Sequence, residues 1–481
     1  MRSWLPPGLI LGSARAVKEI RRCCDSFDGR LFRRNLVCIQ TRRVMRLESL
    51  RAPDHLIEMA PGLRPGERFA RQLPESELRT RLEEILGVRA LISYARLVAW
   101  RQTGALLDDN QKTVARLTLE TVSLLTRPHP VEMGVFLILQ PLHGYSAVTR
   151  QIQSRFQQSG AGAPTDHPFL IAQPFLPVRP DGYRPAMHFE FQSQTSWAQA
   201  FAALGNHLLT VIEANEEGVR RDTDTEFLHD LRVATRRIRA LLGQFRPVLT
   251  DARIASHRTA FREIGDRTNR LRDLDIQLLN ERRYRETLPD DFQSGLNSFF
   301  GQLRQERIEI FQDVRRYLHS ARYRRLKASW RTFLSRVPDD AADPLPDAIE
   351  LKDLAHRGLK RLRRRIDQII GTVGENPSDD HLHQLRIAFK KYRYWIEFFH
   401  SLWPAQELSP LRELQDCLGE FNDLVMLQHG LRTFLDRLRP DTPQAVNTAS
   451  ALGALLIRLH DAQNQKRTFV SELISGFVGT A

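Results

Sequence analysis

The chain contains one eleven-residue segment twice. His229-Asp-Leu-Arg-Val-Ala-Thr-Arg-Arg-Ile-Arg239 is followed, 154 residues later, by His383-Gln-Leu-Arg-Ile-Ala-Phe-Lys-Lys-Tyr-Arg393. Five of the eleven positions are identical, and three more are conservative replacements. A shorter match follows each copy, Leu271-Arg-Asp-Leu-Asp275 after the first and Phe421-Asn-Asp-Leu424 after the second. Two matched features in the same order predict a duplicated structural unit.

Each copy has the pattern of an amphipathic helix. At about 100° per residue, the apolar side chains fall on one side and the basic ones within an arc of about 80° on the other. The predicted buried faces are Leu231, Ala234, Ile238, Leu241, Leu242 and Phe245 in the first copy, and Leu385, Ala388, Tyr392, Trp395, Ile396 and Phe399 in the second. The predicted basic stripes are His229, Arg232, Arg236 and Arg239, and His383, Arg386, Lys390 and Arg393.

These stripes predict an anion-binding function. Like charges one turn apart on a helix cost roughly 0.2–0.5 kcal/mol per pair, and this chain places them together twice. Candidate N-caps within 222–225 and 378–380 put each histidine in or near the first turn. Free N–H groups and the helix dipole attract phosphate at that end of a helix.

Less specific interpretations remain open. The stripes could be solvated faces, or acids such as Asp273, Asp275 and Asp423 could neutralise them. We expect those acids to orient arginines rather than to catalyse, and either histidine could be a structural hydrogen-bonding residue. One histidine per motif gives no zinc ligand set, and the chain has no P-loop, GxSxG or HExxH sequence. We therefore expect no metal, no cofactor and no catalytic residue.

Two further basic runs could widen the site. One covers 315–327, and the other covers 357–365, in which Arg357, Lys360, Arg361 and Arg364 share a helical face. Either run could equally be an ordinary solvated helix.

The pattern of residues divides the chain into two parts joined by a connecting segment. Residues 1–157 contain short strands and turns, with some helix near 75–90, and predict an α+β domain. Residues 158–195 are rich in Gly, Pro and Ser and predict an irregular connection. Helical periodicity covers 196–481, and a Pro- and Asp-rich break at 337–347 divides it into lobes 196–336 and 348–481. The expected fold class is α+β, multidomain, with an all-α second half.

Composition agrees with a polyanionic partner. The 481 residues have a formal net charge of +14. Nearly all the basic residues are arginine, which reflects either codon bias or the ability of guanidinium to hold two phosphate oxygens. No apolar stretch reaches the 18 residues of a membrane span, and the N-terminal apolar run is short for a signal peptide. Four cysteines suit a reducing compartment, so we expect a cytoplasmic location without a membrane partner.

The paired motif, His-x-x-Arg-[Val/Ile]-Ala-x-[Arg/Lys]-[Arg/Lys]-x-Arg followed by an Asp-Leu segment, resembles the CHAD domain, the conserved-histidine α-helical domain. The resemblance covers about 196–481 and includes 414–424. It implies two pseudo-symmetric helical bundles around a basic channel that binds inorganic polyphosphate, with possible recruitment to polyphosphate granules. The residues expected to bind polyphosphate are His229, Arg232, Arg236, Arg237, Arg239, His383, Arg386, Lys390, Lys391, Arg393, Arg357, Arg361 and Arg364.

The first half resembles a CYTH domain, the triphosphate-tunnel β-barrel. Asp25-Ser-Phe-Asp-Gly-Arg-Leu31 is similar to that family's Asp-x-x-Asp-x-x-Leu turn, and Arg96, Arg101 and 115–120 are similar to its central strands. The opening Glu-x-Glu-x-Lys strand is absent from residues 1–12, and 135–140 is apolar where that family places acids. Because tunnel enzymes hold a divalent metal on carboxylates, we interpret this half as a degenerate, inactive CYTH-like barrel.

The leading hypothesis is therefore non-catalytic binding of polyphosphate. A nucleic-acid-binding protein is the first alternative, but base stacking needs exposed aromatic rings, and Tyr392, Trp395 and Phe399 fall on the predicted buried face. The second alternative is a triphosphatase or polyphosphatase that acts through the CYTH-like half. A scaffold with solvated arginine faces is the third. Protein partners cannot be named from the sequence.

Overall fold

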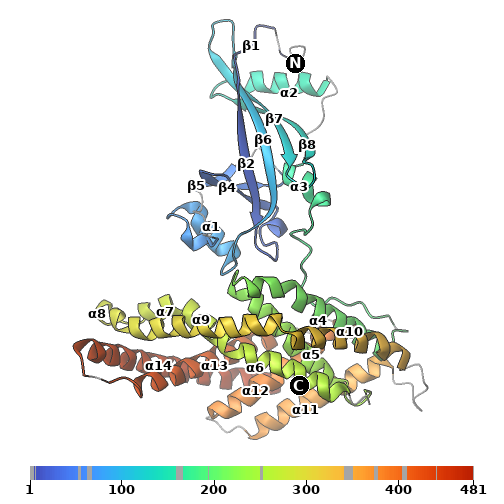
Figure 1. Cartoon of the computed structure of the whole chain (residues 1–481), viewed down its shortest axis with the longest axis vertical. Coiled ribbons are helices and arrows are strands. Elements are labelled where there is room, and N and C mark those ends of the chain that lie inside the picture. The colour runs from blue at the N-terminus through green and yellow to red at the C-terminus, as the bar shows by residue number, and fades with distance from the viewer. Residues whose placement is uncertain are drawn as a thin grey trace. The chain divides into compact units, whose positions relative to one another are not determined.

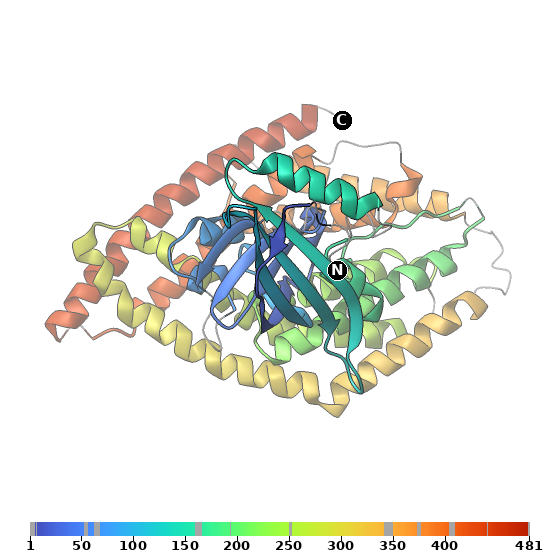
Figure 2. The same ribbon diagram turned by 90° about the horizontal axis from the view of Figure 1, so that it is seen from above.

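The computed structural model forms two compact units, Met1–Arg184 and Pro185–Ala481 (Figures 1 and 2). It describes residues 5, 7–51, 56–61, 68–158, 166–192, 194–249, 253–340, 350–372, 377–403, 409–439 and 441–479. Among the helices so described, none is both long and apolar enough to cross a bilayer.

The first unit is built on a curled antiparallel sheet (Figure 1). Its strands follow the order β5-β4-β3-β2-β6-β7-β8, and β1 pairs with β6. The strands are β1 (Ile10–Leu11), β2 (Arg15–Asp25), β3 (Leu36–Gln40), β4 (Val44–Ser49), β5 (Leu56–Pro61), β6 (Ile92–Leu107), β7 (Thr113–Leu124) and β8 (Val131–Pro141). The α+β class of this half is confirmed, as a half-barrel: in the described residues, no pairing joins the end strands β5 and β8.

Three helices pack on this sheet. α1 (Glu77–Leu86) begins at the N-cap Ser76 and buries Leu78, Leu82 and Leu86, one turn apart, against β2, β3 and β4. α2 (Ser146–Gln158) packs Ile152 against residues of β6 and β7. α3 (Pro168–Ala172) places the ring of Phe169 in a separate cluster with Leu97 and Val122.

The prediction of an irregular connection over 158–195 is wrong for part of that stretch. α3 and the short 3-10 helix Gln173–Phe175 lie within it, and Phe169 and Ala172 are fully buried against the sheet. The Gly and Pro content concealed the short apolar sequence Pro168–Ala172, whose burial depends on a sheet far away in sequence. Residues 176–192 contain no helix or strand, as predicted.

From Trp197 onward, the described residues of the second unit form helices joined by short connections, and its first helices repeat. The helices of its first part are α4 (Trp197–Arg220), α5 (Thr225–Gln244), α6 (Arg253–Leu279), α7 (Glu281–Glu286), α8 (Asp290–Gln293), α9 (Asn297–His319) and α10 (Ala321–Asp340). The second part has α11 (Leu351–Thr372), α12 (Asp379–Phe398), α13 (Ser409–Leu435) and α14 (Pro443–Gly479), of which α13 and α14 run side by side (red in Figures 1 and 2). α11 begins at Leu351 and α12 at Asp379, each 154 residues after the start of its counterpart, α4 at Trp197 and α5 at Thr225.

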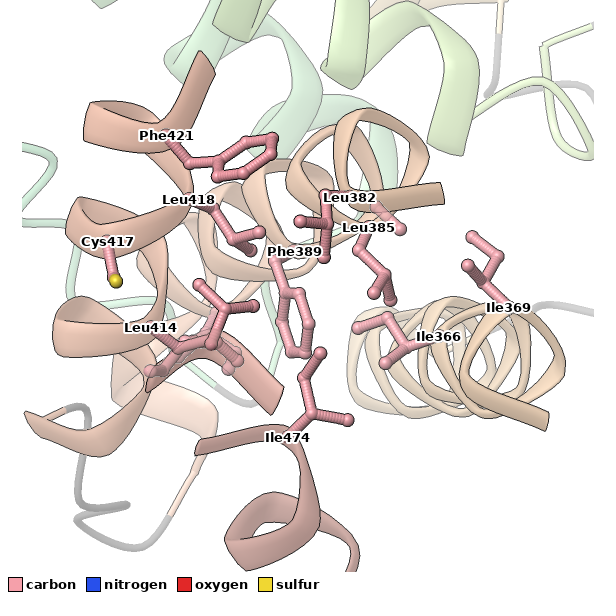
Figure 3. Close-up of a cluster of buried hydrophobic side chains, with 14 residues drawn as sticks. Ile366, Ile369, Leu382, Leu385, Phe389, Leu414, Cys417, Leu418, Phe421 and Ile474 are labelled. Carbon is pink, nitrogen blue, oxygen red and sulfur yellow. The ribbon is translucent and has the colours of Figure 1, made fainter. Parts of the chain in front are cut away.

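The predicted buried faces of both motif helices are confirmed. On α5, Leu231, Ile238 and Leu241 are fully buried. Leu385 of α12 and Phe399, the residue that follows this helix, are fully buried, whereas Tyr392 is only half-buried at the edge of the core. Figure 3 shows Leu382, Leu385 and Phe389 of α12 among Ile366 and Ile369 of α11, Leu414, Leu418 and Phe421 of α13, and Ile474 of α14. This core fixes the orientation of α12, so its basic stripe faces away from it.

A glycine brings α11 close to α12. A Cβ atom on Gly358 would lie 2.5 Å from Cζ2 of Trp395, so only hydrogen fits at this position. The Trp395 indole also donates a hydrogen bond from Nε1 to the carbonyl oxygen of Ala355, at 2.8 Å. The contact matters for the site because α11 carries the basic run 357–365. The predicted break at 337–347 begins inside α10, which continues to Asp340, and its remainder lies outside the described residues.

Candidate anion-binding site

The two motif helices begin where the sequence predicts. The Asp224 carboxylate caps α5 by accepting the N–H groups of Glu226 and Phe227, at 3.0 and 3.3 Å. The Ser378 hydroxyl caps α12 by accepting the N–H of His381, at 3.3 Å. These caps set where each helix starts, and the apolar faces set its rotation. Together they determine the direction of the basic stripes.

Two adjoining pockets lie along these stripes. A pocket of about 560 Å³ is formed by α5, α6 and α12, and one of about 740 Å³ by α11, α12 and the end of α5. They share Gln244, Ile387 and Lys391, so they form one continuous surface, which we call the basic groove. Its basic lining residues are Arg236, Arg239, Arg258, Arg262, Arg357, Arg361, Arg364, Arg365, Arg386, Lys390 and Lys391.

The charge of the basic groove is of one sign. Eleven lysines and arginines line it, and the described lining residues include no Asp or Glu. Arg361 donates a hydrogen bond to Gln244 Oε1 at 2.7 Å, which is a neutral acceptor and leaves the charge uncompensated. Arg236 Nε and Arg386 Nε are buried, and neither has a hydrogen-bond acceptor within the described part of the chain. Buried donors without acceptors are costly, which indicates a surface that gains stability when an anion supplies oxygen atoms.

Crowding of cations shifts the protonation of the groove. Burial and the nearby Arg386, Arg236 and Arg393 guanidinium groups lower the pKa of Lys390 to about 6. Burial also lowers the pKa of Arg239 and of Arg386 below its ordinary value, although both arginines stay charged at neutral pH. The groove thus holds one amine that is mainly neutral at pH 7.

Two of the three acids considered as neutralising partners act on cations of the stripes, but none of the three lines the groove. Asp423 acts electrostatically on Arg386 and Lys390, and Asp273 on Arg232, but neither carboxylate lines the groove. Burial raises the pKa of both carboxyls. Asp275 instead pairs with Arg307 at 2.7 Å, and burial raises its pKa to about 6. Asp275 thus orients an arginine, as expected of these acids, but not one on a stripe.

Three of the predicted binding arginines already have partners in the protein. Arg232 is buried and donates hydrogen bonds to Gly265 O at 3.1 Å, Thr268 Oγ1 at 2.7 Å and Asn269 Oδ1 at 2.7 Å. Burial lowers its pKa to about 10, and its visible role is to hold α6 against α5. Arg237 donates to the Glu397 carboxylate, and Arg393 Nε lies 3.4 Å from the same carboxylate. None of the three lines the basic groove.

Neither predicted histidine lines the groove either. His383 is exposed, and its Nδ1 lies 3.0 Å from Asn422 Oδ1, in the segment that follows the second motif. His229 is half-buried in the first turns of α5. The structure favours the hydrogen-bonding interpretation for His383.

The remaining predicted residues meet in the groove, together with three that the sequence reading missed. Those brought together are Arg236, Arg239, Arg386, Lys390, Lys391, Arg357, Arg361 and Arg364. Those missed are Arg258, Arg262 and Arg365. Arg258 and Arg262 stand four residues apart on α6, so an i, i+4 search of that helix would have found them. Arg365 follows Arg364 within a run already noted, but its position does not share that run's predicted face.

The first unit contains a separate, self-compensating charge network. Arg21 donates to both oxygens of Glu120 at 2.6 Å and to Glu19 at 2.7 Å. Arg46 Nε lies 2.9 Å from Glu48, which also contacts Nε2 of His167 at 3.1 Å. Each of these carboxylates is thus held by a cation or an imidazole. In the described residues, no three His, Cys, Asp or Glu side chains form a group that could hold a metal.

This network includes a glutamate on the first long strand, where the sequence comparison with the CYTH family found none. Glu19 lies on β2, although residues 1–12 contain no glutamate. Arg21 follows it two residues later on the same face and pairs with it. The predicted apolar run 135–140 does lie on a strand, β8. Glu19, Glu48 and Glu120 do not suit a divalent metal, because Arg21, Arg46 and His167 occupy their carboxylates.

Comparisons with known proteins found one family model and similar solved structures. The family model of the CHAD domain matches residues 203–432. The crystal structure of the CHAD domain from the plant Ricinus communis is similar, with a TM-score of 0.52 and 21% identity, over 61% of this chain and 95% of that one. PptA from Streptomyces chartreusis aligns with a TM-score of 0.46 and 15% identity, over 58% of this chain and 100% of that one. A search of the curated proteins found no match.

Proposed function

Because residues 203–432 of this chain are a CHAD domain, we propose that its basic groove binds inorganic polyphosphate without altering it chemically. The observation that carries this proposal is the lining of the groove: eleven cationic side chains and, in the described residues, no carboxylate. A cation-only surface of this extent suits a ligand that carries a negative charge on every repeating unit. The resemblance of the paired motif to the CHAD family supports polyphosphate as that ligand.

Binding would proceed by successive phosphate contacts along the groove. Arginine guanidinium groups bind phosphate oxygens two at a time, and nine of the eleven cations of the proposed path stand on α5, α11 and α12. Buried Arg236 Nε and Arg386 Nε would gain acceptors. Each neutralised phosphate releases counterions, so affinity should fall steeply with salt.

The lining of the groove favours polyphosphate over nucleic acid. Single-stranded nucleic acids are held largely by stacking of bases on exposed aromatic rings. Tyr394 is the aromatic residue among the described lining residues, and it is only 3% exposed. Trp395 and Phe399 are buried in the core. The groove therefore offers charge contacts without a stacking surface.

The charge network of the first unit disfavours the phosphatase alternative. A triphosphate would have to displace Glu19 and Glu120 from Arg21, at the cost of a buried pair with bonds of 2.6–2.7 Å. No residues suited to a divalent metal stand beside them in the described chain. We propose that this unit does not hydrolyse phosphoanhydrides.

A competition experiment tests the proposal. Labelled polyphosphate is bound to the full chain at about 150 mM salt, and unlabelled polyphosphate or single-stranded RNA is added at equal phosphate concentration. We expect polyphosphate to compete at least about tenfold better than RNA, because the groove lacks a stacking surface. Equal competition by RNA would support a nucleic-acid-binding protein instead. Release of phosphate from tripolyphosphate with added Mg²⁺ would contradict the non-catalytic part of the proposal.

A further inference from the structure

Lys390 has unusual surroundings. It lines the pocket formed by α5, α6 and α12, and all the other charged side chains lining that pocket in the described residues are cations. The nearby guanidinium groups belong to Arg236, Arg386 and Arg393, and the Asp423 carboxylate partly opposes their effect. Burial and these neighbours disfavour a further positive charge, which is why the pKa of Lys390 is lowered to about 6. A lysine in this state presents a neutral amine with a free lone pair at pH 7.

The same pocket can hold a phosphate group next to that amine. Arg239, Arg258 and Arg262 line it from α5 and α6, and Arg386 lines it from α12, the helix of Lys390 itself. Arg236 Nε and Arg386 Nε are buried donors without acceptors in the described chain. A small molecule with a phosphate on an electrophilic carbon would therefore place its reactive atom close to Lys390.

We propose that Lys390 is a modification site, acylated by acyl phosphates whose phosphate group docks on the guanidinium groups of the same pocket. The inference rests on the proposed function only in requiring that the groove accept phosphate oxygens.

The reaction needs only the acyl phosphate and the amine. The Lys390 Nζ lone pair attacks the carbonyl carbon of the acyl phosphate, and an N–C bond forms. The bond between that carbon and the bridging phosphate oxygen breaks, and phosphate leaves. The amine loses one proton, which the departing phosphate takes up as hydrogen phosphate. The products are an amide and inorganic phosphate, and the flanking guanidinium groups stabilise the phosphate as it leaves.

Acylation would also regulate the groove. A bound polyanion favours the ammonium form of Lys390, which adds one cation to the binding surface. An amide cannot take up that proton, so the acylated chain should bind polyphosphate less tightly.

The test uses acetyl phosphate and the full chain at pH 7.5. The sequence contains eight lysines, so peptide mapping by mass spectrometry can follow every site. Lys391 is the adjacent, exposed control, and Lys352 is an exposed control outside the groove lining. At pH 7.5 the neutral fraction of Lys390 is about a thousandfold higher than that of an ordinary lysine. Its lower basicity makes the neutral amine roughly a hundredfold less nucleophilic, by the trend known for thiols. We expect Lys390 to be acetylated about tenfold faster than either control, and faster still if docking contributes.

Two further experiments distinguish docking of the phosphate group from the intrinsic nucleophilicity of the Lys390 amine. Phenyl acetate transfers the same acetyl group without a phosphate, and the preference for Lys390 should be smaller with this reagent. Arg262→Gln removes a docking cation that is not among the groups shifting Lys390, and should slow acetylation by acetyl phosphate but not by phenyl acetate. Excess polyphosphate should protect Lys390 and leave Lys352 unaffected.

Acetylation of Lys390 no faster than Lys352 would overturn the inference, and so would an equal preference with both reagents. Polyphosphate affinity is measured on the same preparation. A chain that binds polyphosphate without selective Lys390 acetylation retains the proposed function and loses this inference. Selective acetylation of Lys390 in a chain that does not bind polyphosphate would retain this inference and overturn the proposed function.

Discussion

The arginines of the motif helices fall into two groups, those with hydrogen-bond acceptors among the described residues and those without. Arg236 and Arg386 are buried donors facing a cation-lined groove, whereas Arg232 is fully engaged by acceptors on α6. The three occupy equivalent-looking positions on the stripes. Their helical spacing was predictable from the sequence, but the acceptors of Arg232 lie 33 to 37 residues away, on a helix whose packing no local pattern reveals.

Replacing Arg232 should therefore affect stability first. Arg232→Ala leaves Thr268, Asn269 and the Gly265 carbonyl without their donor, and we expect a loss of about 2–3 kcal/mol in the free energy of unfolding. Arg236→Ala, on the same helix, should change stability little or raise it slightly, since it removes a crowded cation. Denaturant titration of both variants measures the difference. Equal stability of the two would mean that the α6 contacts of Arg232 contribute nothing.

The lowered pKa of Lys390 predicts that polyphosphate binding is coupled to proton uptake. Its pKa in the free chain is lowered to about 6, and a bound polyanion must raise that pKa. Between the free and the bound pKa, each binding event takes up a proton, so affinity rises as pH falls through this range, by at most about tenfold per pH unit. Calorimetry at pH 7 in two buffers with different ionisation enthalpies counts the protons. Lys390→Arg carries a permanent charge and should abolish the uptake; an unchanged proton count in that variant would assign the uptake to another group.

At the scale of helices and strands, the motif helices were predictable and the smaller elements were not. The caps and apolar faces of α5 and α12 depend on the identity and spacing of neighbouring residues, and both helices are found where this pattern predicts them. The missed cations Arg258 and Arg262 stand on α6, which was read only for its Asp-Leu segment. α3 has five residues, too few for any periodicity, and depends for its burial on the distant strands of the sheet.

The contact between α11 and α12 gives a test at this scale. Gly358→Ala would place a methyl carbon 2.5–2.7 Å from three atoms of the rigid Trp395 indole. Overpacking of this kind costs about 1–3 kcal/mol, more than the helix-propensity gain of about 1 kcal/mol. We expect a net loss of stability together with weaker polyphosphate binding, because α11 supplies part of the groove.

Gly371→Ala is the matched control for this substitution. It lies on the same helix, and among the described residues no atom beyond its own stretch of helix lies within 4 Å of the added methyl carbon. It should stabilise the chain by up to about 1 kcal/mol. Thermal unfolding of the two variants gives the comparison, and an unchanged midpoint for Gly358→Ala would show that α11 can move away from Trp395 without cost.

At the scale of the whole molecule, the chain forms two compact units. The sequence predicted an α+β half and a helical half, and both are found. It did not predict that Glu120 pairs with Arg21 and Glu48 with His167, because these partners lie about a hundred residues apart in the chain. The strand glutamates Glu19, Glu48 and Glu120 of the first unit are thus held in internal pairs, whereas the second unit presents eleven cations along a groove.

The central claim is that the basic groove, rather than net positive charge, binds polyphosphate, and the affinity of two charge-matched variants tests it most directly. Arg236→Gln/Arg386→Gln/Lys391→Gln removes three groove cations, and Arg315→Gln/Arg324→Gln/Arg325→Gln removes three exposed arginines of α9 and α10 that do not line the groove. At about 150 mM salt we expect the groove variant to lose roughly a hundredfold or more in affinity and the control to stay within about threefold of the parent chain. Equal losses in the two variants would mean that polyphosphate responds only to net charge, and would contradict the account.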